Sequence, residues 1–486
     1  MVESQGAMPV KESEIKVGII EGVRELKGRF NGAFRCDDGR IFTGPFSAGA
    51  VGTSLNFQGQ QGAPIEGRRN LCFRPEPGAT FTLADVTIGI RFHWERRQEQ
   101  TFQGDLLLLG HPDGTLTAVN RLQLEDYLAS VVSSEMSASA PLEMLKAHAI
   151  ASRSWLMAML QRRREKTTDP GGFVKSKYSP PPAGGDEGEG DRGSWNFNNS
   201  IGPGVRRRDA TGQADEIMRW YDREDHVCFD VCADDHCQRY QGITKIIGDQ
   251  AAEAVRATRG VFLVHDHAIC DARYHKACGG RTDNYENTWE DIPVPYLSSV
   301  ADADVSHEPV DTEAAAQRWM STRPDAYCNT ADAALLHRIL PDFDQETADF
   351  FRWRVSYGRE ALEAILALKS GIDFGFLEDL VPVARGPSGR ITRLRIEGSK
   401  RTVTVGKELE IRRWLSRSHL YSSAFCVSVD RDASGLPVRF ILDGAGWGHG
   451  VGMCQIGAAV MAEKSHKAEA ILKHYFRGAE LKKLYD

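Results

Sequence analysis

Five candidate metal ligands lie within twelve residues of one another, in the segment HVCFDVCADDHC. They are two histidines and three cysteines, namely His226, Cys228, Cys232, His236 and Cys237. Imidazole nitrogen and thiolate sulfur are the usual ligands of Zn²⁺, and four of them close a tetrahedral site. The ordinary alternative is a group of reduced, packed cysteines with incidental histidines. Two more cysteines, Cys270 and Cys278, are close enough in sequence to pair or to lie near the same site.

One carboxylate stands out in the segment SSEMSASAPLEMLKAHAIASRSW. Glu135 ends one amphipathic helical pattern, and a turn of small residues separates it from a second pattern that opens at Pro141. A carboxyl group at the mouth between two helices is partly desolvated, which raises its pKa and makes it a usable general acid. The alternative is a solvated glutamate at a helix end. Lys146, His148 and Arg153 on the second helix have an exposed helix face as their ordinary interpretation.

Glycine alternates with other residues in the segment LDGAGWGHGVGMCQIG, from Gly444 to Gly452. This spacing does not match the G-x-G-x-x-G pattern of a dinucleotide site, because position 449 is a histidine. Alternating glycine indicates a backbone that passes close to another group, with Trp447 and His449 held on it. The alternative is a glycine-rich bend near the core.

The composition sets limits on these chemistries. The chain has 486 residues, of which 41% are hydrophobic, and its 60 Lys and Arg against 67 Asp and Glu leave a net charge of −7. These values exclude a coiled coil, a wholly disordered chain and a general nucleic-acid binder. Apolar runs such as Leu106–Leu109 are far too short to span a bilayer. The first residues lack the basic and apolar regions of an export signal, so we expect either an unusual export route or a leader that has been omitted or cleaved.

The elements that must position these residues follow a segregated order. Strand-like patterns fill residues 14–121, and the two helical patterns follow them. The segment Pro170–Gly204 is rich in Gly and Pro with an acidic run, which predicts a flexible insertion. An α-rich stretch over Asp311–Lys369 then precedes short strands and two C-terminal helices. Segregated strands and helices predict an α+β fold.

Three blocks of the sequence resemble the stage II sporulation protein D family, also called the SpoIID/LytB amidase-enhancer domain. The blocks are LEDYLASVVSSEM with PLEMLKAHAIASR, CGGRTDNYENTWEDIPVPYLSSVAD, and GWGHGVGMCQIGAAVMA with ILKHYFRGAEL. They span about Leu122–Leu484. Two positions depart from the family pattern, since His148 replaces the usual Gln and Cys454 the usual Ser.

The resemblance implies an envelope enzyme that acts on bacterial peptidoglycan. The sporulation branch is a lytic transglycosylase that cleaves glycan strands already stripped of stem peptides, and its catalytic acid corresponds to Glu135. Cleavage at N-acetylmuramic acid then leaves a 1,6-anhydro end and consumes no water. The alternative is a non-catalytic peptidoglycan-binding module that stimulates a cell-wall amidase. Either function implies glycan strands as partner, an extracytoplasmic location, and no nucleic acid.

The resemblance also implies a structural zinc ion and a set of sugar contacts. The implied ligands are His226, Cys232, His236 and Cys237, with Cys228 as the substitute. The residues expected to bind substrate are Lys146, His148, Arg153, Trp447, His449 and Gln455. The implied organisation is a polar tail (1–13), a β-rich N-terminal domain (14–121), a first catalytic part (122–310, with the insertion at about 165–215), an inserted α/β module (311–425) and a last catalytic part (426–486).

Overall fold

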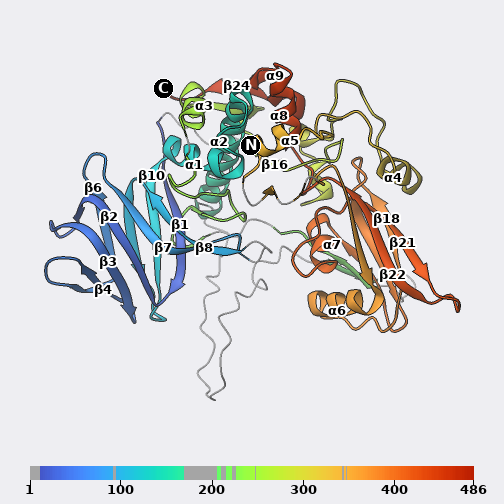
Figure 1. The fold of residues 1–486 in the computed structure, drawn as a ribbon, viewed down its shortest axis with the longest axis horizontal. Coiled ribbons are helices and arrows are strands. Elements are labelled where there is room, and N and C mark those ends of the chain that lie inside the picture. The colour runs from blue at the N-terminus through green and yellow to red at the C-terminus, as the bar shows by residue number, and fades with distance from the viewer. Residues whose placement is uncertain are drawn as a thin grey trace, which may run out of the picture.

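A computed structural model describes residues 11–90, 95–168, 205–208, 215–221, 226–246, 248–341, 344–345, 347 and 349–486. The fold is α+β, as the sequence predicts. A β-rich N-terminal part lies at the left of Figure 1, helices occupy the middle, and a second β-rich body lies at the right. The predicted flexible insertion, Pro170–Gly204, lies outside the described residues.

The N-terminal strands form one sheet, and buried phenylalanine side chains make up much of its core. These strands are β1 (Glu14–Val23), β2 (Glu25–Cys36), β3 (Ile41–Val51), β4 (Ser54–Gly59), β5 (Ile65–Arg68), β6 (Asn70–Pro75), β7 (Thr80–Ile88), β8 (Arg96–Phe102), β9 (Asp105–Gly110) and β10 (Leu116–Gln123). Their order is β13-β1-β10-β9-β6-β2-β3-β4-β5, and β7 pairs with β2 and β8. Alternate residues point inward, so that Phe30 stacks on Phe34 and packs against Phe46. The later strand β13 (Val231–Cys232) joins this sheet beside β1.

The helices in the middle surround α2 (Leu142–Thr168), which begins directly after Pro141. Its neighbours are α1 (Leu124–Glu135), α3 (Gln250–Ala257), α8 (Gln455–Glu463) and α9 (Ala468–Tyr475). From residue 147 to residue 160 every side chain of α2 is buried. The interpretation that His148 and Arg153 lie on an exposed helix face is therefore wrong, because neighbouring elements cover α2 on all sides over this stretch.

Short strands connect these helices to the rest of the fold. They are β14 (Val261–His265), β15 (Ala268–Ile269), β16 (Tyr274–His275), β23 (Met453–Cys454) and β24 (Glu480–Lys483). Strand β14 lies between β15 and β24, and β16 pairs in parallel with β23. The single turns η1 (Tyr285–Asn287) and η2 (Pro295–Leu297) and the helices α4 (Glu313–Met320) and α5 (Ala333–Ile339) complete this region.

The second β-rich body has its own apolar core, built from two sheets and two helices. Its elements are β11 (Val205–Arg208), β12 (Asp215–Met218), β17 (Arg352–Gly358), α6 (Arg359–Ser370), β18 (Leu377–Arg385), β19 (Ile391–Gly398), β20 (Thr402–Gly406), α7 (Glu408–Trp414), β21 (Phe425–Arg431) and β22 (Pro437–Ala445). The sheet orders are β11-β12-β20-β19-β18 and β17-β22-β21. The structure differs here from the expected boundary at residue 425, since β21 and β22 pair within the body that precedes that boundary.

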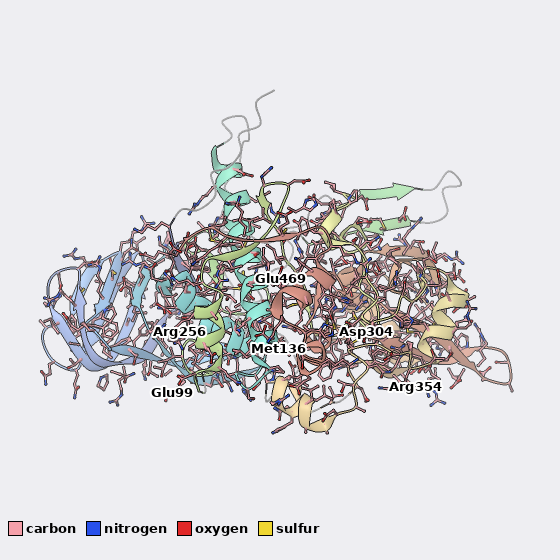
Figure 2. All side chains as sticks on the ribbon, turned by 90° about the horizontal axis from the view of Figure 1, so that it is seen from above. Glu99, Met136, Arg256, Asp304, Arg354 and Glu469 are labelled. Atoms are coloured by element: carbon pink, nitrogen blue, oxygen red, sulfur yellow. The ribbon has the colours of Figure 1, made fainter. Side chains whose placement is uncertain are left out.

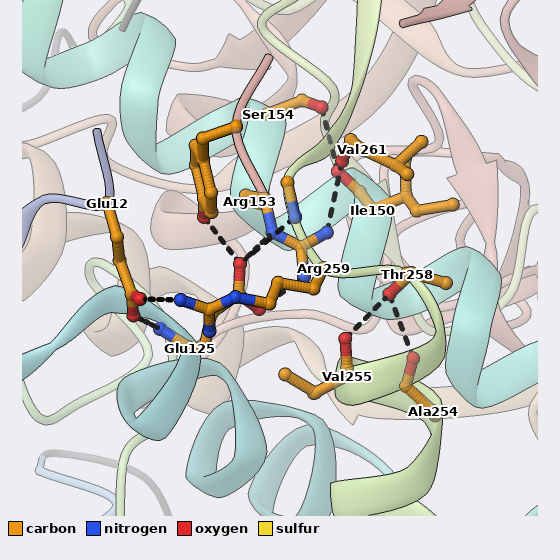
Figure 3. Close-up of polar contacts among 12 residues, drawn as sticks. Glu12, Glu125, Ile150, Arg153, Ser154, Ala254, Val255, Thr258, Arg259 and Val261 are labelled. Atoms are coloured by element: carbon orange, nitrogen blue, oxygen red, sulfur yellow. Dashed lines mark hydrogen bonds and ion pairs between the residues drawn. The ribbon is translucent and has the colours of Figure 1, made fainter. Parts of the chain in front are cut away.

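A buried ion pair joins α1 to α2 (Figure 3). The guanidinium of Arg153 is fully buried and donates to both carboxylate oxygens of Glu125, over 3.0 and 2.6 Å. It also donates to the carbonyl of Val261 at the start of β14, over 3.0 Å. The Glu125 carboxylate accepts further hydrogen bonds from the Gly260 N–H and from the hydroxyl of Tyr485 near the C-terminal end. This one pair therefore connects two helices, a strand and the C-terminal residues.

We expect Arg153→Met to lower the free energy of unfolding by about 3–5 kcal/mol, because it leaves a buried carboxylate without its cation. The control is Arg338→Met, which breaks an exposed pair with Glu463 and should cost about 1 kcal/mol or less. Denaturant titration of both variants measures the difference. Equal losses of unfolding free energy in the two variants would show that the buried pair stabilises the fold no more than the exposed pair does.

Candidate active site and metal centre

Glu135 is the last residue of α1, and its carboxyl group contacts two other segments of the chain. The backbone N–H of Arg239 donates to Oε1 over 2.9 Å, and the hydroxyl of Tyr274 donates to the same oxygen over 3.3 Å. Figure 2 shows that Met136, the next residue, lies between the N-terminal sheet and the C-terminal body. Glu135 itself is partly exposed. The other oxygen, Oε2, has no protein donor among the described contacts.

Burial raises the pKa of Glu135 above its ordinary value. The positive charges of Arg239 and Lys276 and the N–H of Arg239 act in the opposite direction, while the negative charge of Asp235 adds to the rise. The desolvation effect is the largest of these, so the protonated form persists to higher pH than in a solvated glutamate. A carboxyl group whose protonated form persists to higher pH is better suited to donate a proton to a leaving oxygen.

The cations around Glu135 are themselves paired. Arg239 donates to Oδ1 of Asp235 over 2.8 Å through Nε. Lys276 lies 2.8 Å from Oδ2 of Asp344 and donates to the backbone carbonyl of Glu135 over 3.2 Å. The lysine therefore holds the end of α1 in place, and the ion pairs described for these two cations are with Asp235 and Asp344. This arrangement is compatible with a raised pKa.

The four implied metal ligands lie together, and Cys228 does not join them. The donor atoms of His226, Cys232, His236 and Cys237 all lie within 4.8 Å of one another. Nδ1 of His236 is 3.7 Å from the sulfur of Cys232 and 3.4 Å from the sulfur of Cys237. Nε2 of His226 is 3.3 Å from the sulfur of Cys237. Cys228 is exposed.

The hydrogen bond with Cys237, together with burial, raises the pKa of Cys232 to about 12 in the metal-free arrangement. Two sulfurs and two nitrogens at these separations are the donor set of a closed zinc site. The residues present therefore fit a zinc ion, and no ligand position remains for a reacting water.

The metal cluster and Glu135 are connected through a short stretch of backbone. Cys232 lies on β13, where Gly18 of β1 is its partner in the sheet. A side chain at Gly18 would lie 2.5 Å from the ring of Phe229, so only glycine lets this loop approach β1. Arg239, whose N–H bonds Glu135, follows the ligand Cys237 by two residues. The position of the cluster therefore determines where this N–H points.

The glycine-alternating segment lies beside the strand that contacts Glu135. Trp447 exchanges two backbone hydrogen bonds with Ala277, of 3.1 and 2.7 Å, just after β16. The positive φ angles of Gly446, Gly448, Gly450 and Gly452 bend the chain around this strand end. A side chain at Gly452 would lie 2.1 Å from the carbonyl of Arg273. The alternation therefore reflects close backbone approach, as the sequence suggests.

The residues expected to bind sugar fall into two groups. Trp447, His449 and Lys146 are partly exposed, with Trp447 packed on Tyr421 and Lys146 paired with Glu143. The other three are buried. They are His148, whose Nε2 lies 3.3 Å from Nε2 of Gln455, Gln455 itself, and Arg153 in its ion pair. These three buried side chains make polar contacts within the protein in this structure.

Three residues near Glu135 have no signal in the sequence that pointed to them. Tyr274, Lys276 and Arg239 belong to segments in which cysteine and histidine form the recognisable pattern. Their proximity to Glu135 arises from the parallel pairing of β16 with β23 and from the turn after Cys237. The suggested pairing of Cys270 with Cys278 is wrong, since both are free thiols and Cys278 faces Cys328 instead.

Two hollows lie away from Glu135. One, of about 270 Å³, follows the C-terminal half of α2 and is lined by Arg162, Asp271 and Tyr296 among others. The second, of about 450 Å³, lies over β3 and β4. Neither includes Glu135, so the site is defined by the chemistry of its residues and not by these hollows.

Comparison with known proteins gives matches over two stretches of the chain. Residues 112–178, which contain Glu135, match the family described as "Stage II sporulation protein". Residues 283–452 match a domain of unknown function, DUF8618.

The individual relatives have low sequence identity to this chain, but their alignments cover long stretches of it. Stage II sporulation protein D of Bacillus amyloliquefaciens is 22% identical over 365 residues, which is 75% of this chain and 75% of the relative. An uncharacterised protein of Brachyspira hyodysenteriae is 24% identical over 382 residues, covering 78% of this chain and 72% of that protein. The amidase enhancer of Bacillus subtilis is 23% identical over 251 residues, covering 47% of this chain and 32% of the enhancer. These matches make the chain similar to the SpoIID/LytB family, with the family model matching residues 112–178.

Proposed function

We propose that this protein is a peptidoglycan lytic transglycosylase in which Glu135 is the only catalytic carboxyl group. The observation that carries the proposal is the environment of Glu135, a partly exposed carboxyl with a raised pKa, held at a helix end by the Arg239 N–H and the Tyr274 hydroxyl. The relatives named for sporulation and for amidase enhancement support a role in the cell wall. Such a role requires an extracytoplasmic location, and none of the helices described here is long and apolar enough to span a membrane.

The reaction needs one group that first gives and then takes a proton. Protonated Glu135 donates to the glycosidic oxygen after N-acetylmuramic acid, and the bond from C1 to that oxygen breaks. The 6-hydroxyl of the same sugar then bonds to C1 and returns its proton to the carboxylate, leaving a 1,6-anhydro end. An ordinary glycosidase uses a second carboxylate to activate water or to attack C1. The neighbouring Asp235 is occupied by its ion pair with Arg239, which favours the single-acid reaction.

Zinc held by His226, Cys232, His236 and Cys237 has a structural role in this proposal. The ion would supply a cross-link between β13 and the turn that leads to Arg239. The chain's own residues do the chemistry, since the N–H of Arg239 orients Oε1 of Glu135. Loss of the metal therefore affects activity through the position of this N–H.

The second candidate function is stimulation of a cell-wall amidase without cleavage. Similarity to the amidase enhancer of Bacillus subtilis favours it, because part of that protein aligns with this chain. The two functions differ in what Glu135 must do. A stimulating module keeps its effect on an amidase when Glu135 is replaced, whereas an enzyme loses its own product.

We expect Glu135→Gln to lower the rate of anhydro-end formation by about 10²–10⁴-fold, because the amide cannot donate the proton. The substrate is denuded glycan strands, and mass spectrometry of the products provides the measurement. The control, Glu463→Gln, changes an exposed glutamate and should leave the rate unchanged.

Each alternative has its own product in the same assay. Reducing ends in place of anhydro ends would contradict lytic cleavage, because they require attack by water, which ordinary glycosidases activate with a second carboxylate. No cleavage by the wild type, together with amidase stimulation by both proteins on intact sacculi, would establish the binding module instead.

The raised pKa of Glu135 also predicts that the stability difference between the wild type and Glu135→Gln depends on pH. Below the unfolded-state pKa both states carry the proton, and the buried carboxyl adds no charge penalty. As pH rises, the unfolded chain releases its proton first, so the folded wild type loses stability until the pH passes its own raised pKa. Glu135→Gln should therefore be more stable than wild type at pH 8 and equal to it near pH 4, measured by thermal unfolding. A difference that does not change with pH would contradict the raised pKa.

Metal binding predicts opposite results for two cysteines in one loop. Cys232→Ser should remove zinc from the cluster, lower the melting temperature and reduce activity, through unfolding and through displacement of the Arg239 N–H. Cys228→Ser should bind zinc and unfold like the wild type, since Cys228 is exposed and outside the cluster. Zinc content by elemental analysis and calorimetry measure both. Equal zinc loss in the two variants would contradict the ligand assignment.

A further inference from the structure

A second group of soft ligands lies in the interior, apart from the four residues discussed above. It consists of Cys278, Asp302, Cys328 and Cys454. All four are buried, and their donor atoms lie within 4.8 Å of one another. Each comes from a different part of the chain, namely the turn after β16, the loop after η2, the loop before α5 and the end of β23. A tertiary meeting of three thiols and one carboxylate is not a by-product of local spacing.

The sulfur atoms are arranged like the thiolates of a metal site. The sulfurs of Cys278 and Cys328 are 3.5 Å apart. Zn–S bonds of about 2.3 Å in a tetrahedral site place two thiolates about 3.8 Å from each other. The sulfurs also accept backbone hydrogen bonds. The N–H groups of Cys278 and Gly457 point to the sulfur of Cys454, at 3.3 and 3.4 Å, and that of Gly280 points to the sulfur of Cys278, at 3.4 Å. Hydrogen bonds of this kind support ligands from outside a coordination shell.

The carboxylate of Asp302 is fixed by neutral donors only. The hydroxyl of Tyr475 donates to Oδ1 over 2.5 Å, and the N–H of Cys328 donates to Oδ2 over 2.9 Å. A side chain at Gly457 would lie 2.4 Å from Oδ1, so the glycine leaves room for the carboxylate. A fully buried carboxylate needs a cation or a proton. Because each oxygen has used only one lone pair, the carboxylate can still bind a metal.

The side-chain cations of this region do not fill that role. Arg352 donates to the carbonyls of Gly279, Phe351, Trp319 and Thr322. Arg390 donates to the carbonyls of Gly448 and Cys278 and to the hydroxyl of Ser388. None of these bonds reaches a thiol or the carboxylate of Asp302. The cluster therefore has acidic ligands, ordered support and no cation of its own among the contacts described for it.

We propose that Cys278, Asp302, Cys328 and Cys454 bind a second, structural zinc ion. Three thiolates and one carboxylate are soft-to-borderline ligands that suit Zn²⁺, and four protein ligands leave no open position. The ion would join the start of α8 to the turn after β16, the strand that carries Tyr274 and precedes Lys276. Because all four ligands are buried, the ion enters during folding and leaves only when the protein opens.

The first test is the zinc content of purified full-length protein. We expect about two zinc ions per chain in the wild type and about one in Cys328→Ser/Cys454→Ser, which leaves only one thiolate. The control Cys36→Ser/Cys270→Ser changes two buried cysteines outside both clusters and should keep both ions. Cys232→Ser should also retain about one ion. One ion in the wild type that disappears in Cys232→Ser and persists in Cys328→Ser/Cys454→Ser would overturn the proposal.

The zinc content also distinguishes which of the two ligand clusters does not bind zinc. One ion that persists in Cys232→Ser and is lost in Cys328→Ser/Cys454→Ser would support this site and remove zinc from the proposed function. A disulfide between Cys278 and Cys328 would overturn the proposal, and intact mass under non-reducing conditions detects it as a loss of about two mass units.

Two measurements on the wild type do not depend on whether a variant folds. X-ray absorption at the zinc edge should give an average of about two and a half sulfur ligands per zinc, since two thiolates serve one ion and three serve the other. A coordination average of two sulfurs and two nitrogens would overturn the proposal. A chelating dye should also take zinc in two phases, fast from the partly exposed cluster and slow from the buried one. A single fast phase that accounts for all the zinc would contradict a buried ion.

Discussion

The buried ion pair between Glu125 and Arg153 connects the segments on which the position of the proposed active site depends. It lies near the start of α1, and Glu135 lies at the other end of the same helix, about 15 Å away at 1.5 Å per residue. The pair also binds the Gly260 N–H, the Val261 carbonyl and the Tyr485 hydroxyl. Breaking it would free the beginning of α1, a strand and the C-terminal residues together. The position of the proposed acid thus depends on an interaction that never contacts substrate.

The other end of α1 is fixed by polar contacts from two sides. On one side the turn after Cys237 carries the Arg239 N–H to the carboxyl group of Glu135. On the other side β16 provides Tyr274, and Lys276 follows it. Each side contains a cluster of soft ligands close to its contact residue. The carboxyl group therefore keeps its orientation because two separate, strongly restrained segments meet at one helix end.

Burial explains both the expected chemistry and its cost. The same desolvation that raises the pKa of Glu135 makes its ionised form unfavourable for folding. A structure that keeps such a carboxyl group needs stabilising contacts elsewhere. Buried ion pairs and metal-binding clusters are contacts of that kind, because their loss exposes charges that the interior cannot solvate. The stable parts of this protein are thus arranged around a residue that by itself lowers stability.

The sequence by itself determined the features that depend on neighbouring residues. The strand and helix patterns predict the α+β class, and the short spacing from His226 to Cys237 predicts that four of these residues can meet. The position of Glu135 at a helix end is also a local feature. It can be predicted because the 3.6-residue period of apolar residues stops there. His148 and Arg153 show the limit of such patterns, because a polar residue on a helix gives no sign that other elements will cover it.

Only the tertiary structure decided which distant segments meet. Tyr274 and Lys276 lie beside Glu135 because β16 pairs with β23, and no local pattern encodes that pairing. The cluster of Cys278, Asp302, Cys328 and Cys454 joins residues that are far apart in the sequence, so their spacing carries no ligand signal. The physical reason is that side-chain periodicity reports which face of one element is buried, whereas a site between elements depends on how the whole chain packs.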